Sequence, residues 1–378
     1  MPTVADVIHA LDELYDPALA EPWDAIGLVC GAPEASVRRV LFAVDPVAVV
    51  VEEAIRREVD LLVTHHPLYL KGTTSVAATE PKGRLVHRLI AAGIALHVVH
   101  TNADAADPGV SDALAGCLGL LDVAPLQPVP AAATDKLVTF VPRANLEAVV
   151  DALARAGAGE IGDYRRCGYY AEGTGTFIAG AGTNPTVGHP GEVETVPEIR
   201  LEMPFPRSQR AAVLASLRAA HPYEEPAFDV VERADLPSGR GLGRIGTLPA
   251  PVPLARFVAT VARALPTTVA GVRATGDPAA PVGVVAVCGG AGGELADRAA
   301  GAGADVLVTA DLRHHPAGET AERGRPALVD VAHWASEWPW LADAARRLAA
   351  RVDTVETEVS AIVTDPWTVH EDVKDRSA

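Results

Sequence analysis

The clearest structural signal in the chain is Asp60-Leu61-Leu62-Val63-Thr64-His65-His66-Pro67, an apolar run that ends abruptly in two histidines and a proline. Such a run predicts a buried strand of a parallel sheet, and the proline prevents the strand from continuing. Open α/β sheets bind their ligands at the carboxyl ends of the strands. Two neutral imidazoles there suit Zn, Fe, Ni or Co, or a pair of such ions. Two histidines in a solvent-exposed loop are the alternative.

Length and charge restrict the class of protein. A chain of 378 residues predicts two or three domains. No apolar stretch approaches the ~20 residues of a membrane span, and the amino terminus lacks a basic signal region, so we expect a cytoplasmic protein without membrane contact. The net charge of -17 opposes direct binding to nucleic acid. The four cysteines form no C-x-x-C pair, which is typical of reduced thiols.

The two outer parts of the chain alternate strands with helices, which predicts a largely parallel α/β layer in each. They also resemble each other. Residues 60–64 match residues 305–309, and residues 95–100 are paralleled by residues 327–333. We therefore predict two related βαβ-type halves, residues 1–125 and 250–378, that face each other across one cleft.

The middle part of the chain has a different order of expected strands and helices. Residues 135–235 read as strand, helix, two strands, helix and strand, the order of a ferredoxin-like α+β domain inserted into the larger chain. Proline-rich and glycine-rich stretches at residues 124–134 and 236–253 flank it, and we expect both to be linkers.

Five potential metal ligands follow predicted strand ends in the two outer halves: His65, His66, Asp104, His333 and Glu337. The last two stand at positions i and i+4, so they share a helix face, although a surface contact is the alternative for that pair alone. Three imidazoles and two carboxylates are enough for two divalent ions with open positions, the pattern of a catalytic site. The nitrogen and oxygen donors admit Zn, Fe, Mn, Ni or Co.

The chain resembles the Nif-three-like family, whose members carry the name GTP cyclohydrolase 1 type 2 homologue. The matching motifs keep the family's order and lie at residues 21–28, 64–68, 100–104, 309–311 with His315, and 330–337. Residues 136–232 resemble the PII/CutA-like insert of the family's longer bacterial members. Ala310 is a departure, since the family usually has glycine there.

The resemblance implies a two-metal site in a cleft between the related halves, on the same five ligands, and toroidal homohexamers. It places Asp311 and His315 near the metals, so both are candidate catalytic residues. The other histidines are expected to be structural or solvated: His9, His87, His97, His189, His221 and His314.

Two functions from different classes follow. The first is a metal-dependent hydrolase of a nucleotide or related heterocycle, in which activated water attacks an electrophilic carbon. For GTP the attack would open the imidazole ring of guanine. The alternative is a metal-binding adaptor or sensor without catalysis, whose insert binds a small molecule or a partner. A third possibility, an interaction with DNA or a transcription factor, is opposed by the net charge.

Overall fold

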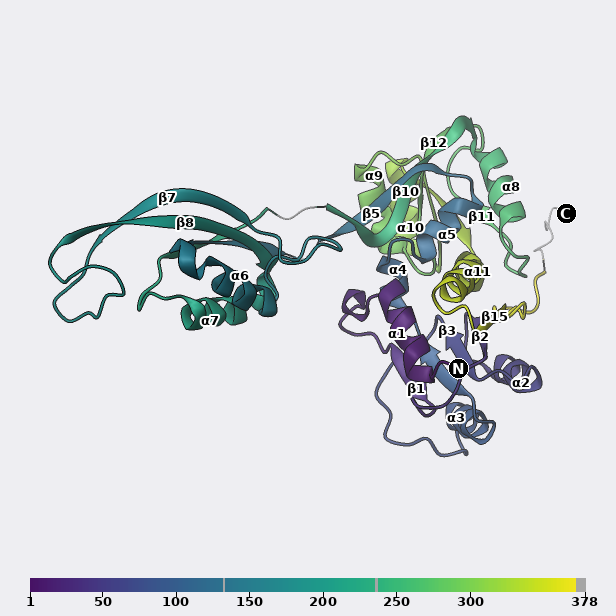
Figure 1. Ribbon diagram of the computed structural model, residues 1–378. Coiled ribbons are helices and arrows are strands. Elements are labelled where there is room, and N and C mark those ends of the chain that lie inside the picture. The colour runs from purple at the N-terminus through teal and green to yellow at the C-terminus, as the bar shows by residue number, and fades with distance from the viewer. Residues whose placement is uncertain (132, 235–236, 372–378) are drawn as a thin grey trace. The chain divides into compact units, whose positions relative to one another are not determined.

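The computed structural model describes residues 1–131, 133–234 and 237–371. Its chain divides into two compact units (Figure 1). Unit 1 combines Met1–Val129 with Ser238–Ala378, and unit 2 is Pro130–Pro237. The two outer parts of the sequence therefore fold together. Within the described ranges, none of the helices has the length and apolar character needed to cross a membrane.

The first sheet of unit 1 has the strand order β1-β4-β3-β2-β15. Its strands are β1 (Gly27–Cys30), β2 (Arg39–Ala43), β3 (Leu61–Thr64), β4 (Ala95–Val98) and β15 (Glu356–Val359). All neighbours are parallel except β1, which is antiparallel to β4. The strand predicted from the apolar run is confirmed as β3, which is buried along its whole length between β2 and β4.

The helices in this part of the chain are α1 (Val4–Leu14), α2 (Ala48–Arg56), α3 (Pro81–Ala91), α4 (Thr101–Ala105) and α5 (Val110–Cys117). Helix α1 begins at a capping box, in which Thr3 and Asp6 satisfy each other's backbone N–H groups. Its apolar positions recur at helical spacing and are buried at Val7 and Leu11. This periodicity explains why α1 packs against the rest of unit 1 along one face.

The second sheet of unit 1 has the order β11-β14-β13-β12-β10-β5. Its strands are β5 (Leu121–Pro130), β10 (Pro237–Pro253), β11 (Arg273–Ala274), β12 (Pro281–Val287), β13 (Val306–Ala310) and β14 (Ala327–Val331). Strands β12, β13 and β14 are parallel. The accompanying helices are α8 (Leu254–Ala264), α9 (Ala296–Gly301), α10 (His314–Arg323) and α11 (His333–Arg351). The prediction of a mixed α/β fold is confirmed.

The prediction that residues 124–134 and 236–253 are linkers is wrong for most of both stretches. They contribute β5 and β10, which are neighbours in the second sheet. Strand β5 lies at the sheet edge, where prolines are tolerated because no ladder donor is lost. The pairing partners are more than a hundred residues apart, so local composition did not reveal them. Ala132 and Leu236 lie outside the described residues.

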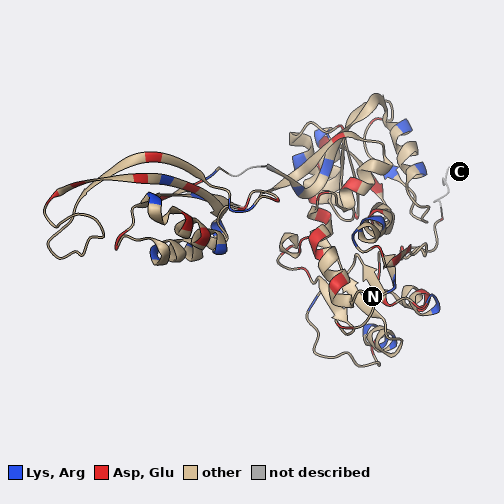
Figure 2. Ribbon diagram, viewed as in Figure 1, with Lys and Arg blue, Asp and Glu red and all other residues tan. Residues whose placement is uncertain are grey.

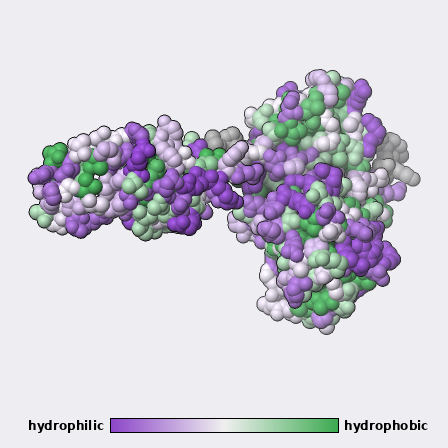
Figure 3. Space-filling view, viewed as in Figure 1, coloured by the Kyte–Doolittle hydropathy of each residue, from purple (hydrophilic) through white to green (hydrophobic). Residues whose placement is uncertain are grey.

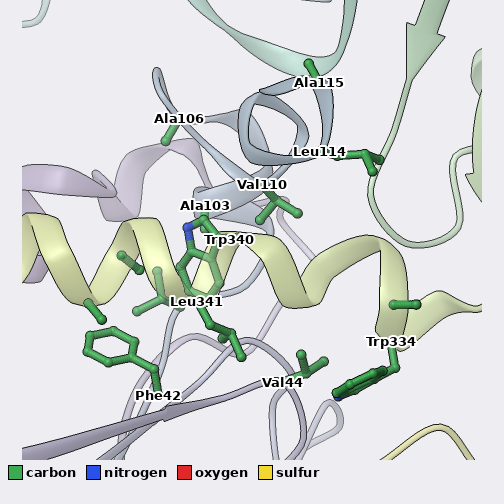
Figure 4. Packing of buried hydrophobic residues seen from close by; sticks show 14 of the residues in the cluster. Phe42, Val44, Ala103, Ala106, Val110, Leu114, Ala115, Trp334, Trp340 and Leu341 are labelled. Atoms are coloured by element: carbon green, nitrogen blue, oxygen red, sulfur yellow. The ribbon is translucent and has the colours of Figure 1, made fainter. Parts of the chain in front are cut away.

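One hydrophobic core joins both sheets of unit 1 to α11. Figure 4 shows Trp340 and Leu341 of α11 packed among Phe42 of β2, Ala103 of α4 and Val110 of α5. Trp340 is 1% exposed, and truncating a tryptophan buried in this way costs roughly 3–5 kcal/mol. The same indole ring lies 5.3 Å from the ring of His65. The core thus holds the first turns of α11 against the carboxyl end of β3.

Unit 2 is an antiparallel sheet with two helices. Its elements are β6 (Thr134–Val141), α6 (Leu146–Arg155), β7 (Tyr169–Ile178), β8 (Val193–Pro206), α7 (Arg210–Ala220) and β9 (Phe228–Glu232). The sheet order is β7-β8-β6-β9, with every pair antiparallel. This is the predicted β-α-β-β-α-β arrangement. Its core contains Leu201 and Met203 of β8 and Val149 of α6.

Candidate metal centre

Two elements of unit 1 bring three imidazoles around one buried carboxylate. His65 and His66 follow β3 directly, and His333 stands one helical turn before Glu337 at the start of α11. The Glu337 carboxylate lies 3.4 Å from Nε2 of His65, 3.1 Å from Nε2 of His66 and 2.9 Å from Nε2 of His333. Residues from both halves of the sequence therefore meet at this carboxylate.

Each imidazole of the cluster uses Nδ1 for a hydrogen bond that fixes the orientation of its ring. The acceptors are Asp45 for His66 (2.7 Å), Asp24 for His100 (2.7 Å), Asp311 for His333 (2.7 Å) and the Val99 carbonyl for His65 (3.1 Å). Metal-binding histidines characteristically make such a bond with the nitrogen that is not the ligand. The bonds at Nδ1 leave Nε2 of every ring available for a cation.

Two overlapping groups in this cluster could hold a metal ion. One is His65, His66 and His100, and the other is His66, His333 and Glu337; within each group the donor atoms lie within 4.8 Å of one another. Nε2 of His65 and Oε2 of Glu337 are buried without a hydrogen-bond partner. Buried polar atoms are rarely left in that state, because each loses its hydration without compensation. A divalent cation fits both orphaned atoms.

The electrostatic field of the cluster favours cations. Burial opposes ionisation of Glu337, but the surrounding imidazoles hold the pKa of this carboxylate well below its usual range. Burial likewise opposes a charge on His333, yet the Glu337 carboxylate raises the pKa of His333 to about 9. Glu337 similarly raises the pKa of His66 well above its ordinary value, with help from Asp45.

The five predicted ligands lie close together. Besides the contacts of Glu337, Oδ1 of Asp104 lies 3.7 Å from Nε2 of His65. Burial raises the pKa of the Asp104 carboxyl, because a buried carboxylate loses its hydration. A nearby cation would offset this penalty and favour the ionised form. Asp104 lies near the end of the short helix α4, which starts just after His100.

The two candidate catalytic residues have different surroundings. Asp311 follows β13 in a left-handed conformation (φ 56°) and contacts His333, so it belongs to the cluster as an orienting group. His315 is exposed on α10, with its ring 5.2 Å from that of His314. Among the described residues no hydrogen bond or ion pair links His315 to the cluster.

The sequence reasoning missed His100, Asp24 and Asp45. His100 completes one of the two groups, and the two aspartates orient His100 and His66. Burial opposes ionisation of Asp24, but hydrogen bonds from His100 and Thr101 hold the pKa of this carboxyl below its ordinary value. The signal was present: His100 and Asp45 follow predicted strands just as His65 does.

A cavity of about 680 Å³ opens beside the cluster. His66 and His333 line it together with Asp311, Trp334 and Trp367. Its volume lies in the range of about 300–1,000 Å³ that small-molecule sites typically have. The imidazoles therefore face a space that could admit a substrate.

Comparison with known proteins identifies the relatives of this chain. Residues 2–366 match the family described as Duf34/NIF3 (NGG1p interacting factor 3). A Mycobacterium tuberculosis protein named GTP cyclohydrolase 1 type 2 homolog is 52% identical over 377 residues, covering 99% of both chains. A Streptomyces coelicolor protein of the same name is 39% identical and covers 98% of this chain and 95% of its own.

Solved structures agree with the relatives found by sequence. A Bacillus cereus protein related to NIF3 is 35% identical, with a TM-score of 0.77 over 98% of this chain and 99% of that one. A Staphylococcus aureus protein is 28% identical, with a TM-score of 0.83 over the same shares. Sequence and fold agree over nearly the whole chain, so the resemblance read from the motifs is confirmed: the chain belongs to the Duf34/NIF3 family.

Proposed function

We propose that this chain binds two divalent metal ions and uses them to hydrolyse a nucleotide or a related heterocycle. The observation that carries the proposal is the pair of overlapping donor groups that share His66. The ligands would be His65, His66, Asp104, His333 and Glu337, with His100 added to the predicted set. Imidazole nitrogens and carboxylate oxygens suit Zn, Fe, Mn, Ni or Co.

The side chains of the cluster have separable roles in such a site. When bound, the ions would supply Lewis acidity and activate water near neutral pH. Glu337 is only 3% exposed and contacts three imidazoles. Its carboxylate would balance part of the positive charge of the bound ions. Asp24, Asp45 and Asp311 would hold three of the rings in position through Nδ1.

The neighbouring cavity supports a substrate with a planar ring. Trp367 lines it and is 68% exposed, so it offers an aromatic surface on which a heterocycle could stack. The names of the relatives suggest GTP, for which the reaction would add water to the carbon between the two nitrogens of guanine's five-membered ring and open that ring.

The experiment compares wild-type protein with His66→Ala, because His66 belongs to both donor groups. His87→Ala is the matched control, since His87 is an exposed histidine on α3. Metal content would be measured after loading with each ion, and turnover of GTP and other nucleotides would be followed by the absorbance change of ring opening. We expect His66→Ala to lose both metal and turnover and His87→Ala to retain both.

Two results would contradict the proposal. Wild-type protein that takes up no divalent ion under any loading condition would remove the metal centre. Metal uptake without turnover of any nucleotide or related heterocycle would remove the hydrolase and favour the metal-binding sensor.

A further inference from the structure

We infer that unit 2 contains a binding site for a compact organic cation with an apolar body. The site is a cavity of about 670 Å³ lined by β7, β8 and the segment around Tyr223. Every lining residue lies within Pro130–Pro237, so the cavity is complete in unit 2 alone. None of the metal-centre residues contributes to it. The inference therefore stands apart from hydrolysis at the metal centre.

The walls of the cavity are largely apolar and aromatic. Phe140, Phe177 and Ile178 line it, and the ring of Phe177 lies 6.4 Å from that of Tyr223. Figure 3 shows hydrophobic residues (green) lying beside hydrophilic ones (purple) on the visible face of unit 2. Walls of this kind bury the carbon skeleton of a small ligand, while a few polar groups fix its orientation.

The polar groups are a buried carboxylate and a half-buried tyrosine whose hydroxyl is buried. Glu198 on β8 is 9% exposed, and among the described residues no lysine or arginine forms an ion pair with it. The hydroxyl of Tyr223 is buried and makes no hydrogen bond. Burial raises the pKa of Tyr223, and the adjacent Glu198 raises it further, so the phenol stays neutral. A buried carboxylate without a cationic partner is costly, and a ligand cation would supply that partner.

Gly175 on β7 gives the carboxylate its room. A Cβ at this position would come within 2.1 Å of Oε2 of Glu198. The glycine-rich segment of β7 thus lets the Glu198 carboxylate lie against the strand backbone. A larger residue there would force Glu198 to move.

The charge of the lining selects a cation over an anion. Glu172, Glu198, Glu224 and Glu225 line the cavity against a single arginine, Arg200; of these carboxylates, Glu172 already forms an ion pair with Arg143. Arg200 already bonds Glu202 at 2.8 Å, so it is not available for a ligand anion. Acidic residues (red) are visible along β7 and β8 in Figure 2.

An organic cation fits the cavity better than a metal ion. In the described part of the chain, the groups of donors close enough to hold a metal lie in unit 1. Glu198 offers one carboxylate in mostly apolar surroundings, whereas divalent ions need several donors. An ammonium or guanidinium group needs only hydrogen-bond acceptors and an aromatic face, which Glu198 and Tyr223 provide.

The test is isothermal titration calorimetry on the full chain with phenethylamine, tyramine, isoamylamine and agmatine. Phenethyl alcohol and phenylacetate serve as the neutral and anionic counterparts of phenethylamine. We expect phenethylamine to bind at least tenfold more tightly than phenethyl alcohol, because a charge-assisted hydrogen bond is lost in the alcohol. Phenylacetate should not bind.

Variants locate the site. Glu198→Gln should weaken amine binding roughly tenfold or more and leave the alcohol unchanged. Glu160→Gln is the matched control, because Glu160 belongs to unit 2 but does not line the cavity. Tyr223→Phe, which removes only the hydroxyl, should weaken the amine a few-fold and keeps the test valid if Glu198→Gln fails to fold.

Three outcomes would overturn the inference. The first is that no amine binds more tightly than about 1 mM, the range of non-specific contact. The second is equal binding of amine and alcohol. The third is amine binding that Glu198→Gln and Tyr223→Phe both leave intact.

Discussion

Asp135 in unit 2 and Glu337 in unit 1 are both buried carboxylates, with 0% and 3% of their surface exposed. Their surroundings are opposite. Both oxygens of Asp135 accept hydrogen bonds from arginines: Nε of Arg207 at 2.9 Å and Nε of Arg210 at 2.8 Å. Glu337 instead faces three imidazoles, and its Oε2 makes no hydrogen bond.

The difference separates a structural ion pair from a ligand site. The charge of Asp135 is balanced by permanently charged guanidinium groups, so it needs nothing from outside the chain. Glu337 is balanced only by imidazoles, whose own Nε2 atoms are suitable metal ligands. A buried carboxylate such as Glu337, whose partners can exchange a proton for a metal ion and whose neighbour His65 has an Nε2 without a hydrogen bond, is therefore the better indicator of a cation site.

The largest effect is expected for Glu337→Gln, which removes the charge but keeps the shape. We expect metal affinity to fall more than a hundredfold, beyond the roughly 10–100-fold typical when a group that merely orients a ligand is lost. Competition with a chelator would measure it. Glu319→Gln on α10, an exposed position, is the control and should be unchanged. An affinity within tenfold of wild type would place Glu337 with Asp135 as a structural carboxylate.

Much of the cluster could be predicted because strand ends are visible in the sequence. The apolar run before His65 and His66 marks the carboxyl end of β3, and helical spacing puts His333 and Glu337 on one face. Asp24 could not be assigned in this way. It lies outside any strand in the loop before β1, and only folding brings it to His100, 76 residues away.

The prediction of strands from the sequence was limited in the same way, because long-range contacts are not visible in local patterns. Local periodicity predicted β2, β3 and β12, because their buried residues are contiguous in the sequence. It failed for β5 and β10, whose composition resembles a linker and whose strand character comes from pairing across a long insertion. His315 lies at an exposed position on α10, and its expected place near the metals stays a prediction.

His97 tests whether an unpartnered buried atom is sufficient evidence for a ligand. Its Nδ1 is buried without a hydrogen bond, but among the described residues no carboxylate forms an ion pair with it, and burial lowers the pKa of His97 to about 4. The folded protein therefore keeps His97 neutral while the unfolded chain, with its ordinary value of 6.5, takes up a proton. Stability is fully present above pH 6.5 and falls as the pH drops to about 4, by about 3 kcal/mol in total.

Urea unfolding of wild type and His97→Gln across this pH range measures the effect. The difference between the two proteins isolates His97, because the other titrating groups are common to both. We expect wild type to lose about 3 kcal/mol relative to the variant between pH 6.5 and 4, without a change in metal content. A difference independent of pH would mean that His97 has a partner in the folded protein.

The smallest effect is expected for Asp135→Asn, the counterpart of Glu337→Gln in unit 2. Breaking a fully buried ion pair costs roughly 3–5 kcal/mol, but Arg207 and Arg210 are 35% and 38% exposed and regain hydration, so we expect about 2 kcal/mol. Metal affinity should be unchanged, because Asp135 serves only unit 2. Denaturant unfolding and chelator competition on the same preparation measure both quantities. Loss of metal without loss of stability would reverse the assignment of the two carboxylates, since it would make the fully paired charge the functional one.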